Sequence, residues 1–235
     1  MVSAPMLHHN SGMQGEPGQA LAAELDIRIP RMDGLSLRVA PVADFEHELH
    51  GPELEAVARA VPKRRQEFAT GRHLARAAMR ELGLPAAPVP RRADRSPVWP
   101  DGCLGSITHT NALAGVAVAR AGVVEGIGID LEESHRVSAE LHDKLFTPTE
   151  LGRYVDAPPG WADLLFSAKE SVYKAVNPIV GKYIGFHEVE VDVTFAEQRF
   201  SARYVGEHAP NALLENGAGY FLFAEQHVFS VFIIP

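Results

Sequence analysis

Alternating apolar and polar positions predict strands in both halves of the chain. Residues 35–40 alternate like a half-buried strand, and three more apolar runs follow near 105–110, 112–119 and 123–132. We expect the runs at 112–119 and 123–132 to pair with each other. Four further strands are predicted near 188–195, 199–205, 219–224 and 227–234.

Helical periodicity separates these strands. A helix is predicted near 52–60 and a longer one over 63–82, where Arg65, Arg72 and Arg76 form a cationic stripe beside an apolar face. Five prolines then make 84–102 a long basic loop. Two more helices are predicted, one starting at a capping box and reaching about 155, and one over 161–176 that a proline is expected to end. The pattern indicates an α+β fold, with a boundary near 120–123.

Composition narrows the class of protein. The 235 residues are 46% hydrophobic with a net charge of −8, which argues against disorder and against a surface built to bind nucleic acid or anionic membranes. Residues 61–95 nevertheless hold nine basic and three acidic side chains, a patch suited to an anion. One cysteine, no secretory signal and no membrane-length apolar run predict a cytoplasmic protein that contacts no membrane.

Two carboxylates end the apolar run at 126–132. Asp130 and Glu132 are two residues apart on a predicted strand, so both point to one face. Carboxylate pairs bind hard cations such as Mg²⁺, which leaves other coordination positions to water and phosphate oxygens. A solvated strand end is the plainer alternative and is equally compatible with this segment alone.

A second charged group lies on the predicted helix at 161–176. Lys169 precedes Glu170, and Lys174 follows Glu170 by one helical turn. An ordinary surface ion pair explains such a spacing most simply. Phe166 and Tyr173 lie near the same side of the helix, however, which indicates that this charged edge borders packed surface.

Hydroxyl side chains alternate along the strand at 105–110. Ser106, Thr108 and Thr110 flank Ile107 and His109, a combination that suits a phosphate when arginines lie nearby. A single histidine is more often structural than catalytic, and the other histidines show no metal-binding spacing.

Together these motifs resemble those of the 4′-phosphopantetheinyl transferases. The resemblance is carried by residues 128–132, by Lys169-Glu170 with Tyr173-Lys174, and by 106–110. Residues 63–76 with Trp99-Pro100 are similar to the subgroup that contains enterobactin synthetase component D. Ser171 departs from the alanine usual after Lys-Glu but removes no functional group.

The resemblance implies a fold of two similar α/β halves with the active site in the cleft between them. Residues 1–20 would form a flexible leader, 21–121 the N-terminal half with the CoA-binding basic patch, and 122–235 the C-terminal half with the metal-binding carboxylates. It implies a monomer that transfers phosphopantetheine from coenzyme A to a serine of an apo acyl, peptidyl or aryl carrier protein and releases 3′,5′-ADP. Synthases of nonribosomal peptides, polyketides or siderophores would be the acceptors.

The resemblance also implies roles for individual residues. Asp130, Glu132 and Glu170 would hold Mg²⁺, and the catalytic groups would be Glu170, Lys174 and His109, with Glu170 helping to deprotonate the serine and Lys174 neutralising charge on the phosphate. Coenzyme A would be contacted by Arg64, Arg72, Arg91, Ser106, Thr108, His109, Lys169 and Lys174. Residues 146–163 are a candidate surface for carrier docking.

Two other functions fit the same residues. A Mg²⁺-dependent phosphohydrolase would use the carboxylates, a lysine and a basic patch without any carrier protein. A coenzyme A-binding or carrier-binding module without catalysis would leave the four groups Asp130, Glu132, Glu170 and Lys174 unexplained.

Overall fold

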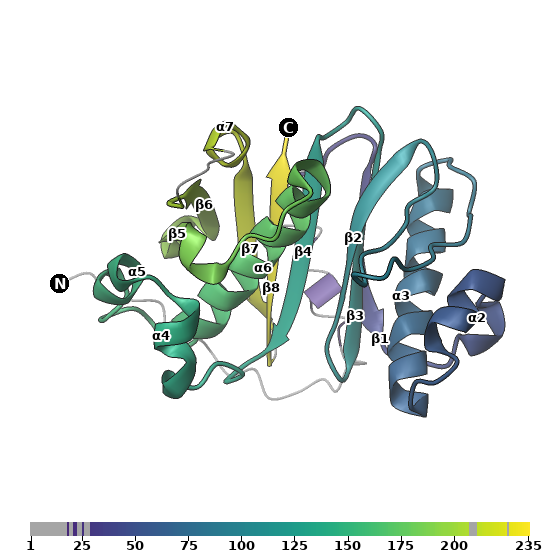
Figure 1. The fold of residues 1–235 in the computed structure, drawn as a ribbon, viewed down its shortest axis with the longest axis horizontal. Helices are drawn as coiled ribbons and strands as arrows, with labels where there is room; N and C mark the ends of the chain where they lie inside the picture. Colours follow the sequence, from purple (N-terminus) through teal and green to yellow (C-terminus); the bar gives the residue numbers. More distant parts are fainter. Residues whose placement is uncertain (1–17, 19–20, 23–24, 26–28, 207–210, 225) are drawn as a thin grey trace.

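Two antiparallel sheets lie side by side in the computed structural model, which describes residues 18, 21–22, 25, 29–206, 211–224 and 226–235 (Figure 1). The expected leader falls outside these residues, apart from Gly18. The first sheet has the order β1-β3-β2, formed by β1 (Leu35–Pro41), β2 (Cys103–His109) and β3 (Leu113–Arg120). The second has the order β4-β8-β7-β6-β5, formed by β4 (Gly126–Glu133), β5 (Val189–Thr194), β6 (Arg199–Tyr204), β7 (Ala218–Ala224) and β8 (His227–Ile234). The α+β class is confirmed.

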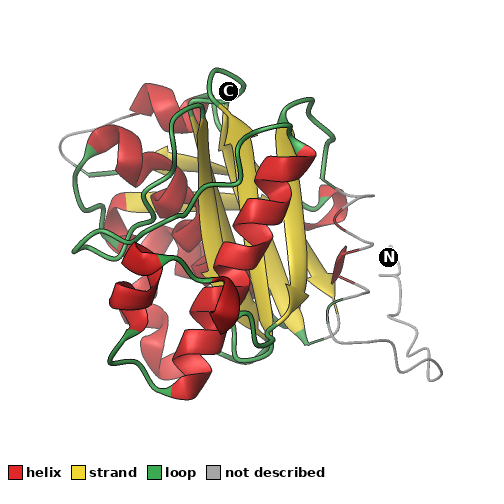
Figure 2. Cartoon of the chain, turned by 90° about the vertical axis from the view of Figure 1, so that its right-hand side faces the viewer, coloured by secondary structure: helices red, strands yellow, loops and turns green. Residues whose placement is uncertain are grey.

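One long helix packs on each sheet. Helix α3 (Pro62–Glu81) covers the first sheet, and Figure 2 shows it crossing in front of the strands. Helix α6 (Trp161–Val180) lies on β4 and β8 of the second sheet. The shorter helices are α2 (Gly51–Val57), α4 (His142–Leu145), α5 (Pro148–Arg153) and α7 (Asn211–Glu215), with 3₁₀ turns at Glu46–Glu48, Ala139–Leu141, Phe186–Glu188 and Phe195–Glu197.

Local chemistry explains where α3 and α5 begin. Pro62 is the first residue of α3, where its missing N–H costs no helical hydrogen bond. The predicted capping box of α5 is confirmed: the Thr147 hydroxyl accepts from the Glu150 N–H at 3.2 Å, and the Glu150 carboxylate accepts from the Thr147 N–H at 2.8 Å. It satisfies two of the orphan donors at the helix end. No helix in the described part of the chain is both long and apolar enough to cross a membrane.

The expected pairing of the third and fourth strands is wrong. β3 is flanked on both edges, by β1 and by β2, and β4 pairs with β8 in the other sheet. After Arg120 the chain therefore crosses from one sheet to the other, and the Glu125 N–H already donates to the Ile234 carbonyl of β8. Side-chain alternation reports which face of a strand is buried but not which strand lies beside it.

The expected end of the long second helix is also wrong. Pro178 lies inside the last turn of α6, and the helix ends at Gly181 in the left-handed conformation, φ 67°. A proline this near the end removes one helical hydrogen bond, and the packing of Val180 against the core of the second sheet favours the extra turn.

Hydroxyl side chains join the two sheets. β2 and β4 are edge strands that face each other, and the Ser106 hydroxyl accepts from the Ile129 N–H at 3.1 Å while the Thr108 hydroxyl accepts from the Leu131 N–H at 3.2 Å. These bonds satisfy buried backbone donors that no neighbouring strand pairs. We call this junction the seam, defined by β2 residues Ser106 and Thr108 and by β4 residues 129–131.

A hydrophobic core continues behind the seam. One cluster of buried side chains includes Leu113 and Ala117 of β3, Ile129 of β4 and Phe229 of β8, and Leu21 of the N-terminal segment packs into it. The two sheets therefore share this cluster, in addition to the separate cluster that each sheet forms with its own long helix.

Candidate active site

Two glycines let helix α6 approach strand β4 at the seam. A Cβ on Gly128 would lie 1.9 Å from the Ser171 carbonyl oxygen and 2.6 Å from the Ala175 nitrogen, so only glycine fits. Gly126 is nearly as crowded, because a Cβ there would lie 2.6 Å from the Ala175 carbonyl oxygen. This close approach brings the Lys174 ammonium to 2.6 Å from Asp130 Oδ1.

Asp130 lies at the centre of the seam and is 3% exposed. Its Oδ1 accepts from Lys174 and, at 3.3 Å, from the Thr108 hydroxyl. Its Oδ2 is buried and has no hydrogen-bond partner among the described residues. A buried carboxylate oxygen without a donor is costly, so this atom is suited to a ligand.

Three carboxylates accumulate negative charge here. Burial and the neighbouring Asp130 raise the pKa of Glu132 to about 7, against the opposing effect of Lys174 and Arg136. Burial also raises the pKa of Glu170, with Asp130 adding to the shift and Lys174 opposing it. Burial disfavours the charged form of Lys174, but the carboxylates of Asp130, Glu170 and Glu132 outweigh it and raise its pKa. The site therefore favours additional positive charge.

The chemistry of these donors fits a hard divalent cation. They are carboxylate oxygens, one of them unpaired, in a cluster whose raised pKa values a cation would relieve. Within the described ranges no three acidic, histidine or cysteine side chains are already gathered tightly enough to hold a metal ion. Ligands from a phosphate-bearing substrate would complete the coordination of Mg²⁺, which commonly takes only one or two protein carboxylates.

His109 lies at the end of β2 between two side chains of α3. Arg64 Nη1 contacts His109 Nε2, and Glu67 Oε2 lies 3.4 Å from His109 Nδ1 and 3.1 Å from Arg64 Nη1. Burial and the Arg64 charge lower the pKa of His109, and Glu67 opposes the shift. Sequence reasoning missed Glu67. Its one signal was its position three residues after Arg64 on a predicted helix.

The arginines of the basic patch cluster around Arg72. Its side chain is buried, lies over the Phe68 ring at 3.7 Å and donates to the Val89 carbonyl at 3.0 Å. Burial lowers the pKa of Arg72 to about 10; the cations of Arg64 and Arg91 add to the shift, and Glu53 opposes it. Mutual repulsion among these guanidinium groups favours a bound anion.

Arg76 has a different role from its neighbours in the cationic stripe. Its guanidinium is 3% exposed and donates to both oxygens of Glu53, at 3.0 and 3.1 Å. Glu53 is fully buried and also accepts from the Val89 N–H at 2.8 Å. This pair fixes the basic loop to α2 and α3. Arg91 belongs to that loop and donates to the Ala56 carbonyl at 3.2 Å.

Lys169 lies away from the arginine cluster. Its ammonium is buried and donates to Glu150 at 2.6 Å, to the Phe186 carbonyl at 2.6 Å and to the Leu145 carbonyl at 3.1 Å. Burial lowers its pKa, although Glu150 opposes the shift. This position favours a structural role. The Ser106 and Thr108 hydroxyls, expected to contact phosphate, likewise bond within the seam.

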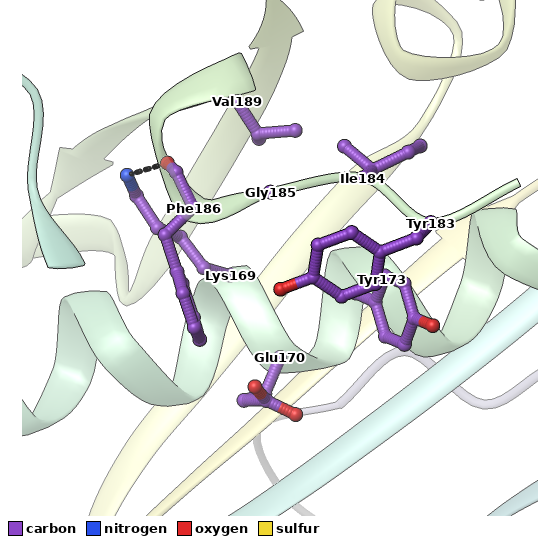
Figure 3. A pocket seen from close by; sticks show the side chains of 8 residues that line it. All are labelled: Lys169, Glu170, Tyr173, Tyr183, Ile184, Gly185, Phe186 and Val189. Carbon is purple, nitrogen blue, oxygen red and sulfur yellow. Dashed lines mark hydrogen bonds between the residues drawn. The ribbon is translucent and has the colours of Figure 1, made fainter. Parts of the chain in front are cut away.

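A pocket lies beside Glu170, which forms part of its wall (Figure 3). Most of its lining is apolar or aromatic. The lining residues are Lys169, Glu170, Tyr173, Tyr183, Ile184, Gly185, Phe186 and Val189. Tyr173 and Tyr183 meet edge to face, with ring centroids 5.7 Å apart. A carboxylate at the wall of an apolar pocket can act on a group that the pocket positions.

Comparison with known proteins places both halves of the chain in one family. Residues 52–119 match the model of the 4′-phosphopantetheinyl transferase N-terminal domain. Residues 126–230 match the model of the 4′-phosphopantetheinyl transferase superfamily.

Curated relatives agree with these matches. Over 156 residues the chain is 36% identical to 4′-phosphopantetheinyl transferase PptT of Mycobacterium tuberculosis, covering 65% of this chain and 69% of that protein. It is 43% identical to 4′-phosphopantetheinyl transferase Svp of Streptomyces mobaraensis over 156 residues, covering 64% of this chain and 63% of that protein. Enterobactin synthase component D of Escherichia coli O157:H7 is 38% identical over 129 residues, covering 53% and 60%. The chain belongs to the 4′-phosphopantetheinyl transferase superfamily.

Proposed function

We propose that this transferase moves the 4′-phosphopantetheine group from coenzyme A to a serine hydroxyl of an apo carrier protein, depends on Mg²⁺ and releases 3′,5′-ADP. Coenzyme A is the substrate of the family. The observation that carries the proposal is the meeting of Asp130, Glu132, Glu170 and Lys174 at the seam, within one chain and beside the arginine cluster.

The two charged clusters match the two charged parts of coenzyme A. Asp130, Glu132 and Glu170 would hold Mg²⁺, which supplies charge neutralisation on the pyrophosphate when it is bound. Arg64, Arg72, Arg91 and His109 would receive the nucleotide and its 3′-phosphate, because guanidinium groups pair well with phosphate oxygens. Ser106 and Thr108 support these contacts from within the seam, and Lys169 supports the wall of the pocket.

The chemical step is an in-line displacement at phosphorus. The serine oxygen forms a bond to the phosphorus next to pantetheine, the bond from that phosphorus to the ADP oxygen breaks, and Glu170 takes the serine proton directly or through a water. The raised pKa of Glu170 makes it a better base than an exposed carboxylate. Lys174 offsets the charge that develops on the transferred phosphate and protonates the leaving ADP.

The pocket beside Glu170 would receive the first part of the pantetheine arm, next to its phosphate. The pantetheine arm is an uncharged chain of methylene and amide groups, and the lining from Tyr173 to Val189 is largely apolar. A pantetheine arm bound in this pocket would begin next to Glu170, so the phosphate attached to the arm would lie at the seam.

The proposal also covers the acceptor of the phosphopantetheine group and the oligomeric state of the enzyme. We propose that acyl, peptidyl or aryl carrier domains of nonribosomal peptide, polyketide or siderophore synthases are the acceptors, because relatives include enterobactin synthase component D. Residues 146–163 are the candidate docking surface. A monomer is consistent with the site, because Thr108 and Asp130 come together within one chain. A cytoplasmic location stays a prediction from the sequence.

Mass spectrometry of the carrier tests the function. Apo carrier protein, enzyme, coenzyme A and Mg²⁺ are incubated, with an EDTA control and with acyl, peptidyl and aryl carriers compared. We expect the carrier to gain the mass of one phosphopantetheinyl group only when the metal is present. Breakdown of coenzyme A without labelling would establish a phosphohydrolase instead. Binding of coenzyme A with neither reaction would establish a binding module.

A further inference from the structure

Glu67 is a nearly buried carboxylate that the proposed function leaves without a role. It lies on α3 with its side chain 10% exposed. Its Oε2 is 3.1 Å from Arg64 Nη1 and 3.4 Å from His109 Nδ1, so one oxygen faces two groups of the basic site. Burying a carboxylate is costly unless its partners compensate it, and here both partners belong to the proposed nucleotide site.

The contacts around His109 define one tautomer of the ring. Arg64 Nη1 contacts Nε2, and because a guanidinium group can only donate, Nε2 must be the acceptor. The proton of a neutral imidazole is then on Nδ1, which is the nitrogen that faces Glu67. Arg64 at Nε2 and Glu67 at Nδ1 therefore favour the same tautomer, and the two side chains also contact each other.

We propose that Glu67 is a positioning residue that holds Arg64 and His109 together for one phosphate group of the nucleotide. This inference rests on the proposed function. The Arg64 side chain is 42% exposed, so without Glu67 it would lose its tether and its rotamers would spread. Glu67 also provides the negative charge that keeps a guanidinium and an imidazole close together. Lys174 is the other charged group near His109, and it adds a second cation to this side.

Substitution with a matched control tests the role. Glu67→Leu removes the acceptor at similar size, and Glu67→Gln keeps an acceptor oxygen without the charge. Glu46→Leu is the control, because Glu46 pairs at 2.8 Å with Arg65, the neighbour of Arg64 on the same helix, and contacts no residue of the proposed site. Binding of adenosine 3′,5′-bisphosphate by calorimetry and the KM and kcat for coenzyme A are measured for each.

We expect Glu67→Leu to weaken bisphosphate binding and to raise KM by about tenfold, the effect of one charge-assisted hydrogen bond, while kcat changes little. Glu67→Gln should recover part of this loss, and Glu46→Leu should match the wild type. Equal affinity in Glu67→Leu and wild type would overturn the proposal. So would parallel losses in kcat and in thermal stability, since these would indicate a structural role alone.

Nitrogen NMR of the histidines gives a readout that needs no substrate. At pH 8 we expect wild-type His109 to carry its proton on Nδ1, and Glu67→Leu to populate the other tautomer. An unchanged tautomer would overturn the inference. Failure of the wild type to bind the bisphosphate or to label a carrier would refute the proposed function. The comparison of tautomers would still test whether Glu67 orients His109.

Discussion

Replacing Gly128 with alanine tests whether the contact between α6 and β4 builds the active site. The new Cβ would lie 1.9 Å from the Ser171 carbonyl oxygen, where ordinary contacts begin at 3.4 Å, so backbone must move by about 1.5 Å. The two atoms that the new Cβ would meet, the Ser171 carbonyl oxygen and the Ala175 nitrogen, belong to the backbone and cannot rotate away. Overpacking of this kind costs about 1–3 kcal/mol of the free energy of unfolding. The same displacement would separate Lys174 from Asp130, and misplacement of about 1 Å can cost about a hundredfold in rate.

Two measurements check this prediction. Urea unfolding gives the loss of stability, and the initial rate of carrier labelling at saturating coenzyme A gives the loss of kcat. Gly51→Ala at the first residue of α2 is the control, because a Cβ there meets nothing within 4 Å and the residue lies outside the proposed docking surface, so both values should stay near wild type. A Gly128→Ala enzyme with wild-type stability and wild-type rate would refute the reasoning that close packing of α6 on β4 positions Lys174.

Three further substitutions probe the charges and hydroxyls of the fold. Glu132→Gln should stabilise the metal-free protein by about 1–3 kcal/mol at pH 8 and by almost nothing at pH 4.5. The folded-state pKa of Glu132 is raised to about 7, so the wild-type protein loses stability as the pH rises from the ordinary carboxyl pKa through 7. Urea unfolding in EDTA at the two pH values measures the difference. Glu150→Gln should cost about 3–5 kcal/mol, because it leaves the buried Lys169 ammonium without its counter-ion, and a small change in the denaturation midpoint would contradict that account. Thr108→Val should cost about 1–3 kcal/mol, because the buried Leu131 N–H loses its acceptor; unchanged thermal unfolding would show that the seam does not depend on this bond.

Local patterns predicted the elements because the relevant physics is local. Strand alternation reports burial on one face, and a capping box such as Thr147 with Glu150 satisfies helix ends within a few residues. Strand partners are set by segments far apart in the chain, so β4 pairs with β8 rather than with the adjacent β3. Pro178 also could not be interpreted from local sequence alone. A proline favours ending a helix, but packing of the last turn of α6 outweighed that preference.

Part of the candidate site could be predicted from the sequence, because some of its residues lie in short local motifs. The Asp130 and Lys174 motifs are short and distinctive, and the structure brings them to hydrogen-bond distance. The sequence could not distinguish internal from exposed charges. Lys169 was expected to contact phosphate but lies buried against Glu150. Glu67 was only counted among the three acidic residues of the basic patch, yet it lies beside His109. Only the tertiary arrangement separates these cases.

The shared core behind the seam makes the two sheets a single cooperative unit. Leu113 and Ile129 come from different sheets and pack in one cluster with Phe229, and the seam hydroxyls cross the same junction. Neither sheet can detach without exposing the other's apolar surface, so the chain should unfold in one transition rather than sheet by sheet. Severing the chain between 120 and 123 would yield two fragments that need each other to fold. A phosphate group bound at the seam would then depend on the stability of the entire molecule, because separating the two edge strands means unfolding both sheets.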